Sequence, residues 1–507
     1  MTIYNFNLGI GWANSGVEYA QSYRAKLLRE LGQEAKFIFT DLILSENIEH
    51  LTANLGLKDE EVIWLYSYFT DVKISPTTYT LADLKASLGQ EVVKEVRNGK
   101  TETVYLYLAS KNSWVAAYLK NSQSDLVERA EFVSNNCLYR KDYYTYTRLF
   151  SEYYTPRDNR AYVYQRLFFN EDGSVAYEEI MDGDSPQMFR FPDKILYSKA
   201  EFIDYFISKL SFKAGDILLL DRSKGLGQQV FRNKGEAKLG VLVHADHFSE
   251  HSVDDDYILW NDYYDYQFTN SEAVDFFVVA TASQRDLLLK QFAKYEHKQP
   301  KVVVIPVGSV DKFRHPKVTR RPFALITASR LAPEKHVDWL VNACIRAHKE
   351  IPDLTLDIYG EGGGKEQLEK LIANNQAQKY IRLKGHQDLK EQYVNYAAYI
   401  TASTTEGFGL SLLEAIASGL PLIGLDVRYG MQTFVDNGQN GYVCPWSDSM
   451  GAPRIVDNLA FAITELFKAD LSKFREHSYH KAQTFMEANV RQAWAELIAT
   501  EGGLGHA

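Results

Sequence analysis

The chain has 507 residues, a formal net charge of −10 and 24% charged residues. This length exceeds one typical hydrophobic core and predicts two or three domains. The acidic balance argues against a nucleic-acid-binding protein, because phosphate contacts need a basic surface. The three cysteines, Cys137, Cys344 and Cys444, are far apart and form no C-x-x-C pair. This spacing is typical of a reducing compartment and predicts neither a disulfide framework nor a metal site.

The start of the chain has neither the basic region nor the apolar region of a signal peptide. No apolar run reaches the roughly 18 residues that a membrane-spanning helix needs. We therefore expect a cytoplasmic protein, which could also lie at the inner face of the membrane through a partner.

The first segment has the pattern of a βαβ unit. Residues 2–7 and 36–40 are expected strands, residues 17–31 an expected helix, and Gly9, Gly11 and Gly16 mark the loop between the first strand and the helix. Such alternation predicts the opening of an α/β domain.

Between about residues 61 and 191 the pattern changes to short runs rich in Tyr, Val and Phe. Expected strands are 104–108, 115–119, 161–169 and 175–181. Asn98-Gly99 and Asp172-Gly173 are typical hairpin turns. We predict a mainly antiparallel sheet inserted into the first domain.

The α/β pattern then resumes and continues to the end of the chain. Before a basic, proline-bearing link at 306–322, the expected elements are a helix at 200–210 and strands at 216–220, 240–244, 276–280 and 302–306. After the link, the expected strands are 323–327, 354–359, 381–383, 399–401 and 421–425. The expected helices there are 337–349, 364–374, 409–418, 458–467 and residue 471 onward.

These patterns predict an α/β protein with two α/β domains and a mainly antiparallel sheet inserted into the first. Residues 1–60 and 192–310 would form the N-terminal domain, and residues 61–191 the inserted sheet. Residues 311–480 would form the C-terminal domain, and residues 481–507 a final helix.

The strongest motif is Glu406-Gly-Phe-Gly-Leu-Ser-Leu-Leu-Glu414, which follows an expected strand. Gly407 and Gly409 allow a ligand to approach the backbone closely, and the new helix directs free N–H groups at it. A diphosphate suits such a site, with Glu406 near a transferred sugar and Glu414 near a ribose. The alternative interpretation is that Glu406 is a solvated loop residue and Glu414 a charge on the helix surface. This alternative suits a lone glutamate better than two glutamates that flank a glycine turn after a strand.

A second motif, Ser329-Arg-Leu-Ala-Pro-Glu-Lys335, follows the strand expected at 323–327. In open α/β sheets, ligands bind at the carboxyl ends of strands. Arg330 and Lys335 could hold a diphosphate leaving group, with Arg as a planar fork and Lys as a compact charge. Two ordinary surface cations are the alternative interpretation.

Weaker signals follow other strands. Residues 360–364, Gly-Glu-Gly-Gly-Gly, could be a phosphate loop or a plain strand-to-helix turn, and Gly385 with His386 could border a base pocket. In the cluster 244–247, His-Ala-Asp-His, we favour contact with a sugar over a metal site, because adjacent strand residues point to opposite faces. The acidic run 254–256 is expected to be solvated.

With these motifs the chain resembles the retaining GT-B glycosyltransferases of family four. The resemblance implies two Rossmann-like domains facing a cleft, with the acceptor side in residues 1–60 and 192–310 and the nucleotide sugar bound by residues 311–480. It also implies that the helix within residues 481–507 crosses back to the first domain.

The resemblance implies that Arg330 and Lys335 hold the donor's diphosphate and that Glu414 binds its ribose. It also implies first-domain contacts to sugar and phosphate from His244 and Gly16. The resemblance further implies that Glu406 and the backbone of the residues after it contact the sugar and phosphates. These following residues are Gly407, Phe408, Gly409, Leu410 and Ser411.

A closer resemblance covers essentially the whole chain. Residues 14–19 (Asn-Ser-Gly-Val-Glu-Tyr), the inserted sheet and residues 244–248 resemble the catalytic subunits of accessory-Sec glycosyltransferase complexes, the GtfA family. That family implies transfer of N-acetylglucosamine from UDP-N-acetylglucosamine to Ser/Thr of serine-rich repeat adhesins. It also implies a homologous non-catalytic partner, GtfB, with the inserted sheet serving partner and acceptor contacts.

We therefore predict a metal-independent, retaining transferase without a cofactor, whose catalytic residues are His244, Arg330, Lys335 and Glu406. Same-face attack is expected, with Glu406 binding the sugar rather than forming a covalent intermediate. A teichoic-acid-type polyol-phosphate glucosyltransferase would carry the same motifs. A non-catalytic acceptor-binding subunit would be expected to lack Arg330, Lys335 and the two glutamates of the motif, which are all present here. A glycoside hydrolase would need a carboxyl pair across the glycosidic bond instead of a phosphate site.

Overall fold

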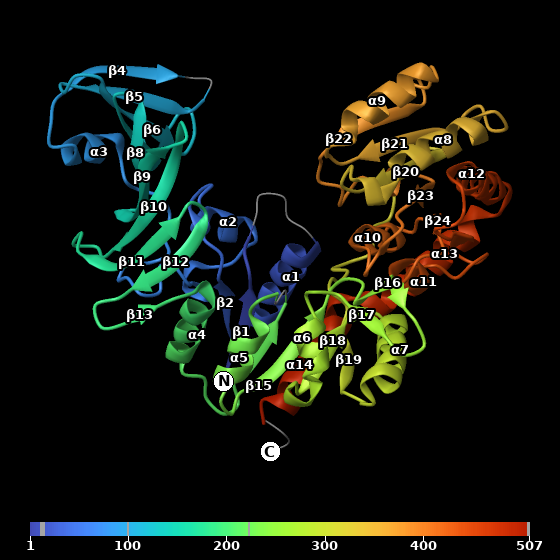
Figure 1. Cartoon of the computed structure of the whole chain (residues 1–507). Coiled ribbons are helices and arrows are strands. Elements are labelled where there is room, and N and C mark those ends of the chain that lie inside the picture. The colour runs from blue at the N-terminus through green and yellow to red at the C-terminus, as the bar shows by residue number, and fades with distance from the viewer. Residues whose placement is uncertain (11–15, 99–100, 222–223, 504–507) are drawn as a thin grey trace. The chain divides into compact units, whose positions relative to one another are not determined.

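The computed structural model describes residues 1–10, 16–98, 101–221 and 224–503, and Figure 1 labels their helices and strands. The chain divides into two compact units. The first contains Met1–Gly240, Asp262–Val274 and Glu501–Gly503, and the second contains Val241–Asn261 and Asp275–Thr500. Strand β15 (Lys238–Val243) runs through the division.

Unit 1 opens with the predicted βαβ unit. Strand β1 (Thr2–Asn7) pairs in parallel with β2 (Glu34–Phe39) and with β14 (Ile217–Leu220). Helix α1 (Gly16–Glu30) joins β1 to β2, and the residues before it, including Gly11 and the first two of the 14–19 motif, lie outside the described residues. Strand β3 (Val62–Trp64) pairs with β2, so residues 62–64 extend this parallel sheet although the predicted insertion begins at residue 61.

Besides α1, and apart from a helix that packs on the antiparallel sheet, the described part of unit 1 contains α2, α4, α5 and α6. Helix α4 was predicted, and its N-cap residue Ser198 accepts a hydrogen bond from the Glu201 amide, as Ser does at many helix starts. The bounds are α2 (Ile48–Asn54), α4 (Lys199–Leu210), α5 (Gly227–Asn233) and α6 (Asp265–Thr269).

The predicted antiparallel sheet has ten strands, and each pairs with its neighbour in the sequence. Its strands are β4 (Val92–Asn98), β5 (Thr103–Leu108), β6 (Ser113–Leu119), β7 (Val127–Ser134), β8 (Cys137–Tyr144), β9 (Arg148–Arg157), β10 (Arg160–Phe169), β11 (Val175–Asp182), β12 (Ser185–Arg190) and β13 (Ile195–Leu196). The Asp172-Gly173 turn joins β10 to β11, and Gly173 has a φ of 81°. The other predicted turn falls on residues 99–100, outside the described residues.

One face of this sheet carries its own apolar core. Helix α3 (Leu81–Ser87) buries Leu81 and Leu84 against strand residues such as Leu106 and Val115, and Figure 1 shows it beside these strands. Six of the ten strands were not predicted. Strand β4, for example, has charged residues inside an exposed run, so its apolar alternation is weak.

Unit 2 contains a six-stranded parallel sheet in the order β22-β21-β20-β23-β24-β25. The strands are β20 (Ala324–Ala328), β21 (Thr355–Tyr359), β22 (Ile381–Gly385), β23 (Ala398–Ile400), β24 (Leu422–Leu425) and β25 (Gly441–Cys444). Its helices are α8 (Val337–His348), α9 (Lys365–Asn374), α10 (Leu410–Ala417), α11 (Gly430–Phe434), α12 (Ala452–Lys468), α13 (Leu471–Ala482) and α14 (Glu487–Glu501). The helix expected from residue 471 is therefore two helices, α13 and α14.

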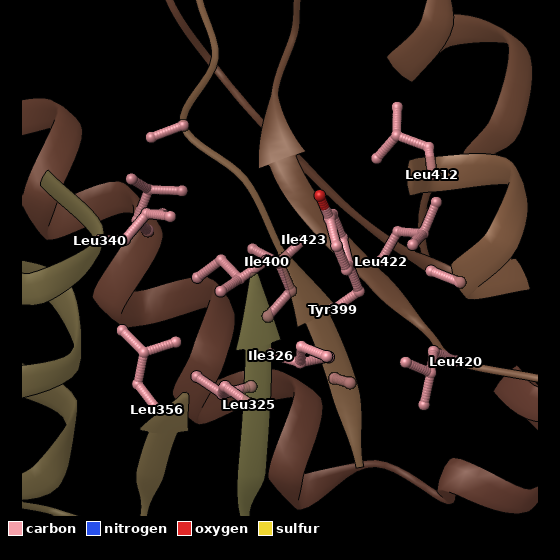
Figure 2. Close-up of a cluster of buried hydrophobic side chains, with 14 of the residues drawn as sticks. Leu325, Ile326, Leu340, Leu356, Tyr399, Ile400, Leu412, Leu420, Leu422 and Ile423 are labelled. Carbon is pink, nitrogen blue, oxygen red and sulfur yellow. The ribbon is translucent and has the colours of Figure 1, made fainter. Parts of the chain in front are cut away.

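The core of this sheet lies on both of its faces. Ile326, Ile400 and Ile423 on adjacent strands have no exposed surface, and Figure 2 shows Leu340 of α8 and Leu412 of α10 on either side of the strands. Burial on both faces explains why these strands read as continuous apolar runs in the sequence.

Two strand pairs complete unit 2. Strands β16 (Phe248–Val253) and β17 (Ile258–Trp260) form a hairpin whose turn exposes the acidic run 254–256, as predicted. Strands β18 (Phe276–Val279) and β19 (Val302–Val304) pair in parallel, with α7 (Ala282–Gln291) between them in sequence. Among the helices of the described residues, none is long and apolar enough to cross a membrane.

Candidate active site

The strand order of the unit 2 sheet fixes where a ligand would bind. Counted along the chain, its strands have the doubly wound order 3-2-1-4-5-6, which reverses between β20 and β23. In such sheets the ligand crevice lies outside the carboxyl ends of the strands at this switch point. The Arg330–Lys335 motif follows β20, and the Glu406 motif follows β23. The two strongest sequence motifs therefore flank the switch point.

The structure brings Lys335 and Glu406 into direct contact. The Lys335 Nζ lies 2.7 Å from Glu406 Oε1 and donates a second hydrogen bond, of 3.0 Å, to the Ser403 hydroxyl. Both charged side chains are partly buried, with 18% and 16% of their surface exposed. An ammonium has three N–H donors and a carboxylate has several acceptor positions, so this pair keeps a free donor and the free Glu406 Oε2 for a ligand.

The backbone of the Glu406 loop is held from two sides. The Glu406 carbonyl accepts hydrogen bonds from the amides of Tyr429, at 2.7 Å, and Gly430, at 3.0 Å. Gly407 lies against the backbone that follows β15, where an added Cβ would be 2.5 Å from the His244 carbonyl oxygen. Only glycine fits this approach, so Gly407 serves backbone packing beside the site.

Gly409 is the N-cap of α10 and has a φ of 88°, a left-handed conformation that favours glycine. Leu410 and Ser411 form the first turn, whose amides have no partner within the helix. The Ser411 hydroxyl accepts a 2.9 Å hydrogen bond from Tyr399. The Phe408 side chain is buried in the core, 4% exposed, so only its backbone is available to a ligand.

Glu414, in the same helix, accepts a 3.0 Å hydrogen bond from the buried Tyr393 hydroxyl. Burial raises the pKa of the Glu414 carboxyl above its usual value. Its partner fixes one carboxylate oxygen, Oε2, and a ligand hydroxyl could use the other.

The glycine-rich segment 360–364 has a structural explanation. An added Cβ on Gly360 would lie 1.9 Å from the Ser329 carbonyl oxygen, and one on Gly362 would lie 2.7 Å from that of Leu331. The segment therefore packs closely against the backbone of the loop that carries Arg330. The Arg330 side chain is 65% exposed and pairs with Glu334 at 3.2 Å.

Three other predicted residues lie apart from this pair. Gly385, with a φ of 70°, ends β22, and His386 after it is exposed. Both belong to the carboxyl edge of the same sheet. Gly16 begins α1 in unit 1.

The cluster 244–247 follows β15 as a loop instead of continuing the strand. The Asp246 carboxylate accepts a 2.9 Å hydrogen bond from Thr405, next to Glu406. His247 is fully buried, 2.6 Å from the Gln291 amide oxygen and 3.2 Å from the Tyr429 hydroxyl. Burial lowers the pKa of His247 to about 4, so it is neutral near pH 7. Within the described ranges, no group of three or more His, Cys, Asp or Glu side chains could hold a metal ion.

Sequence reasoning missed several residues that position the site. Ser403 binds Lys335 and Thr405 binds Asp246, and both lie just before the glutamate motif. Their closeness to Glu406 in the sequence was the only signal that could have identified them. Tyr429 lies in a loop after β24, and nothing in the sequence connects it to Glu406 or His247.

Two family models match the chain. One, described as the GtfA extended beta-sheet domain, matches residues 95–193, and the other, glycosyl transferases group 1, matches residues 309–460. The first covers most of the ten-stranded sheet, and the second covers the sheet that carries the Lys335–Glu406 pair.

Similar proteins align over nearly the whole chain. The GtfA subunit of the UDP-N-acetylglucosamine–peptide N-acetylglucosaminyltransferase of Streptococcus gordonii is 51% identical over 499 residues, 98% of each chain. The crystal structure of the pneumococcal O-GlcNAc transferase GtfA with UDP and GlcNAc has a TM-score of 0.94 at 50% identity, covering 100% of this chain and 99% of that one. A GtfA/B complex structure matches with the same TM-score and identity over 99% and 100%. The fold is the GT-B fold, as predicted, and the chain belongs to the GtfA family of glycosyltransferases.

Proposed function

We propose that this protein transfers N-acetylglucosamine from UDP-N-acetylglucosamine, with retention, to Ser/Thr hydroxyls of a serine-rich repeat adhesin. It would do so as the catalytic subunit of a complex with a GtfB-type partner. The similarity to GtfA subunits over 98% of the chain supports the donor, the sugar and the partner. The observation that carries the proposal for this chain's own residues is the Lys335–Glu406 pair at the switch point of the sheet.

In this proposal the cationic residues stabilise the leaving diphosphate. Lys335 directs its third N–H at a phosphate oxygen, and the first-turn amides of α10 add the positive end of the helix. The exposed Arg330 supplies a planar fork of donors to the same group. Fixed donors of this kind replace the charge of a metal ion, so we expect metal-independent transfer.

The carboxylates and the remaining residues orient the donor. Glu406 Oε2 accepts a hydroxyl of the transferred sugar, and Glu414 accepts a ribose hydroxyl. Gly385 and His386 would border the base, and His244 and Gly16 are proposed to approach the sugar and phosphates from the first domain. Because Glu406 is held by Lys335, we assign it to binding, and we propose that the acceptor hydroxyl attacks from the face that the diphosphate leaves.

The remaining proposals concern organisation. The ten-stranded sheet presents an edge strand, β4, whose side chains are largely exposed, and edge strands pair readily with another chain. We propose that the sheet contacts the partner and the acceptor, and we retain 1–60 with 192–310, 61–191, 311–480 and 481–507 as proposed domains. The cysteines, none in a disulfide, fit the cytoplasm, where we place the protein.

The test is an assay of transfer from UDP-N-acetylglucosamine to a serine-rich peptide in the presence of the partner. UDP release and the mass of the peptide are measured. Lys335→Met should lower kcat by about 10²–10³-fold, the usual cost of one donor to a developing negative charge. Lys370→Met is the matched control, because Lys370 is 69% exposed and, within the described ranges, pairs only with Glu366 on α9. Chelation of divalent metals should leave the rate unchanged.

Three outcomes would contradict parts of the proposal. Equal turnover of Lys335→Met and Lys370→Met would remove the site assignment. Transfer to poly(glycerol phosphate) instead of the peptide would favour the teichoic-acid type of enzyme. No transfer from any nucleotide sugar by the complex would favour a non-catalytic subunit.

A further inference from the structure

A second cavity lies in unit 2 at the opposite edge of the sheet from the candidate active site. It encloses about 540 Å³, and its lining includes Phe323 and Ala397, the residues immediately before β20 and β23. The Lys335 and Glu406 motifs follow the carboxyl ends of these same strands, so the cavity, here called the amino-edge pocket, is a separate site. Its volume lies in the range of small-molecule pockets.

Two guanidinium groups, those of Arg320 and Arg475, line the amino-edge pocket, and neither has a carboxylate partner among the residues that the structure describes. Arg320, 8% exposed, donates hydrogen bonds to the carbonyl oxygens of Val394 at 2.9 Å and Ser418 at 2.7 Å. These neutral carbonyl oxygens satisfy its hydrogen-bond donors but do not neutralise its positive charge. Arg475, on α13, has a buried Nε with no hydrogen-bond partner, and it forms no ion pair within the described part of the chain. Neither guanidinium group therefore has a carboxylate in direct contact among the described residues.

The two arginines also disfavour each other. Burial lowers the pKa of Arg320, and the nearby positive charge of Arg475 lowers it further, against the opposing effect of Tyr479. Burial likewise lowers the pKa of Arg475, and Tyr479 and Asp470 only partly oppose this shift. An anion beside both groups would offset the desolvation and the repulsion, because charge-assisted hydrogen bonds are roughly twice as strong as neutral ones.

The rest of the lining is mainly apolar. It comes from the link before β20, the end of α12 and the start of α13, and consists chiefly of Pro316, Val318, Pro322, Phe323, Phe467 and Leu471. A free inorganic ion would leave these walls in contact with water. A ligand with an apolar body would bury these walls, and removing apolar surface from water favours its binding.

We propose that the amino-edge pocket binds a small organic anion, a phosphate monoester or carboxylate with an apolar body, with its charged head at Arg475 and Arg320. The proposal is independent of the donor and acceptor of the transfer reaction, since the pocket shares no residue with the Lys335–Glu406 site.

The experiment is calorimetric titration of the whole protein with octyl phosphate below its micellar concentration, with saturating UDP present. Octyl glucoside supplies the tail with an uncharged head, and inorganic phosphate supplies the head without a tail. We expect octyl phosphate to bind at least tenfold more tightly than either. Arg475→Gln should weaken that binding at least tenfold, since it removes a charge-assisted contact.

Two further variants separate binding from folding. Val318→Asp places a negative charge on the lining at a residue that is 69% exposed, and it should weaken octyl phosphate tenfold or more without affecting stability. Lys473→Gln, on the same helix but outside the lining, should change binding less than twofold. Arg320 is left intact because it joins three backbone segments. Displacement by UDP, equal binding of octyl glucoside, no binding of octyl phosphate, or no effect of Arg475→Gln would each overturn the proposal.

Discussion

The approach of Gly407 to the backbone after β15 gives a test that needs no assumption about the substrate. In Gly407→Ala the new methyl carbon would start 2.5 Å from the His244 carbonyl oxygen, whereas ordinary contacts begin at 3.4 Å. Both partners are backbone, so no side chain can rotate away, and the loop must move by most of that difference. Overpacking of this kind costs about 1–3 kcal/mol of stability.

The larger effect should be on transfer. A displacement near 1 Å of a group that positions the reacting atoms can lower the rate by about 10²-fold. Gly407 adjoins Glu406, whose carboxylate lies 2.7 Å from Lys335, so the shift falls directly on this pair. We expect kcat to fall by about two orders of magnitude at a temperature where the variant remains folded. UDP release and urea unfolding measure the two effects.

Gly363→Ala is the matched control for this substitution. A Cβ there has no neighbour within 4 Å, and Gly363 lies in the same unit, in the segment before α9. Its turnover and stability should match those of the unmodified protein. If Gly407→Ala turned over within twofold of Gly363→Ala, the close approach would not govern the site and the reasoning would fail.

Three further predictions concern stability and the ion pair. His247→Gln should remove a pH dependence of stability. Between pH 6.5 and about 4 the unfolded histidine binds a proton that the folded one does not. As the pH falls through this window, the unmodified protein should therefore lose about 1.4 kcal/mol of unfolding free energy per pH unit relative to the variant, measured by urea unfolding. Arg166→Met should cost about 3–5 kcal/mol by thermal unfolding, because it removes the cation that pairs with the buried carboxylates of Glu152 and Glu179, 2.9 and 3.0 Å from the guanidinium. Ser403→Ala removes the second hydrogen-bond acceptor of Lys335, and under the proposed function it should lower kcat by about tenfold with little change in stability.

Each of these has a contrary result. Parallel pH profiles of the His247→Gln variant and the unmodified protein would show that this histidine is not buried as a neutral group. A loss below 1 kcal/mol for Arg166→Met would mean that the sheet solvates the two carboxylates. Unchanged kcat for Ser403→Ala would show that the glutamate alone positions the lysine.

The sequence by itself determined the parallel sheet of unit 2 and the two motifs at its switch point. Strands buried on both faces, such as β20 and β24, appear as unbroken apolar runs. The two motifs follow the carboxyl ends of β20 and β23, where ligands bind in open α/β sheets. The GT-B fold followed from these features and from family resemblance. The roles assigned to the individual site residues stay predictions.

The inserted sheet was predicted only in part. Strands β5, β6, β10 and β11 have clear apolar character, but the exposed β4 and the charged β8 do not. In a meander, each strand is stabilised by pairing with its neighbours, so a strand with a polar face gives little local signal.

Only the tertiary structure decided which groups meet. It placed the Tyr429 amide on the Glu406 carbonyl, buried His247 against Gln291, and packed Gly360 and Gly362 against the backbone of Ser329 and Leu331. These contacts join segments far apart in the sequence, and they depend on the close packing of loops, which no local periodicity encodes.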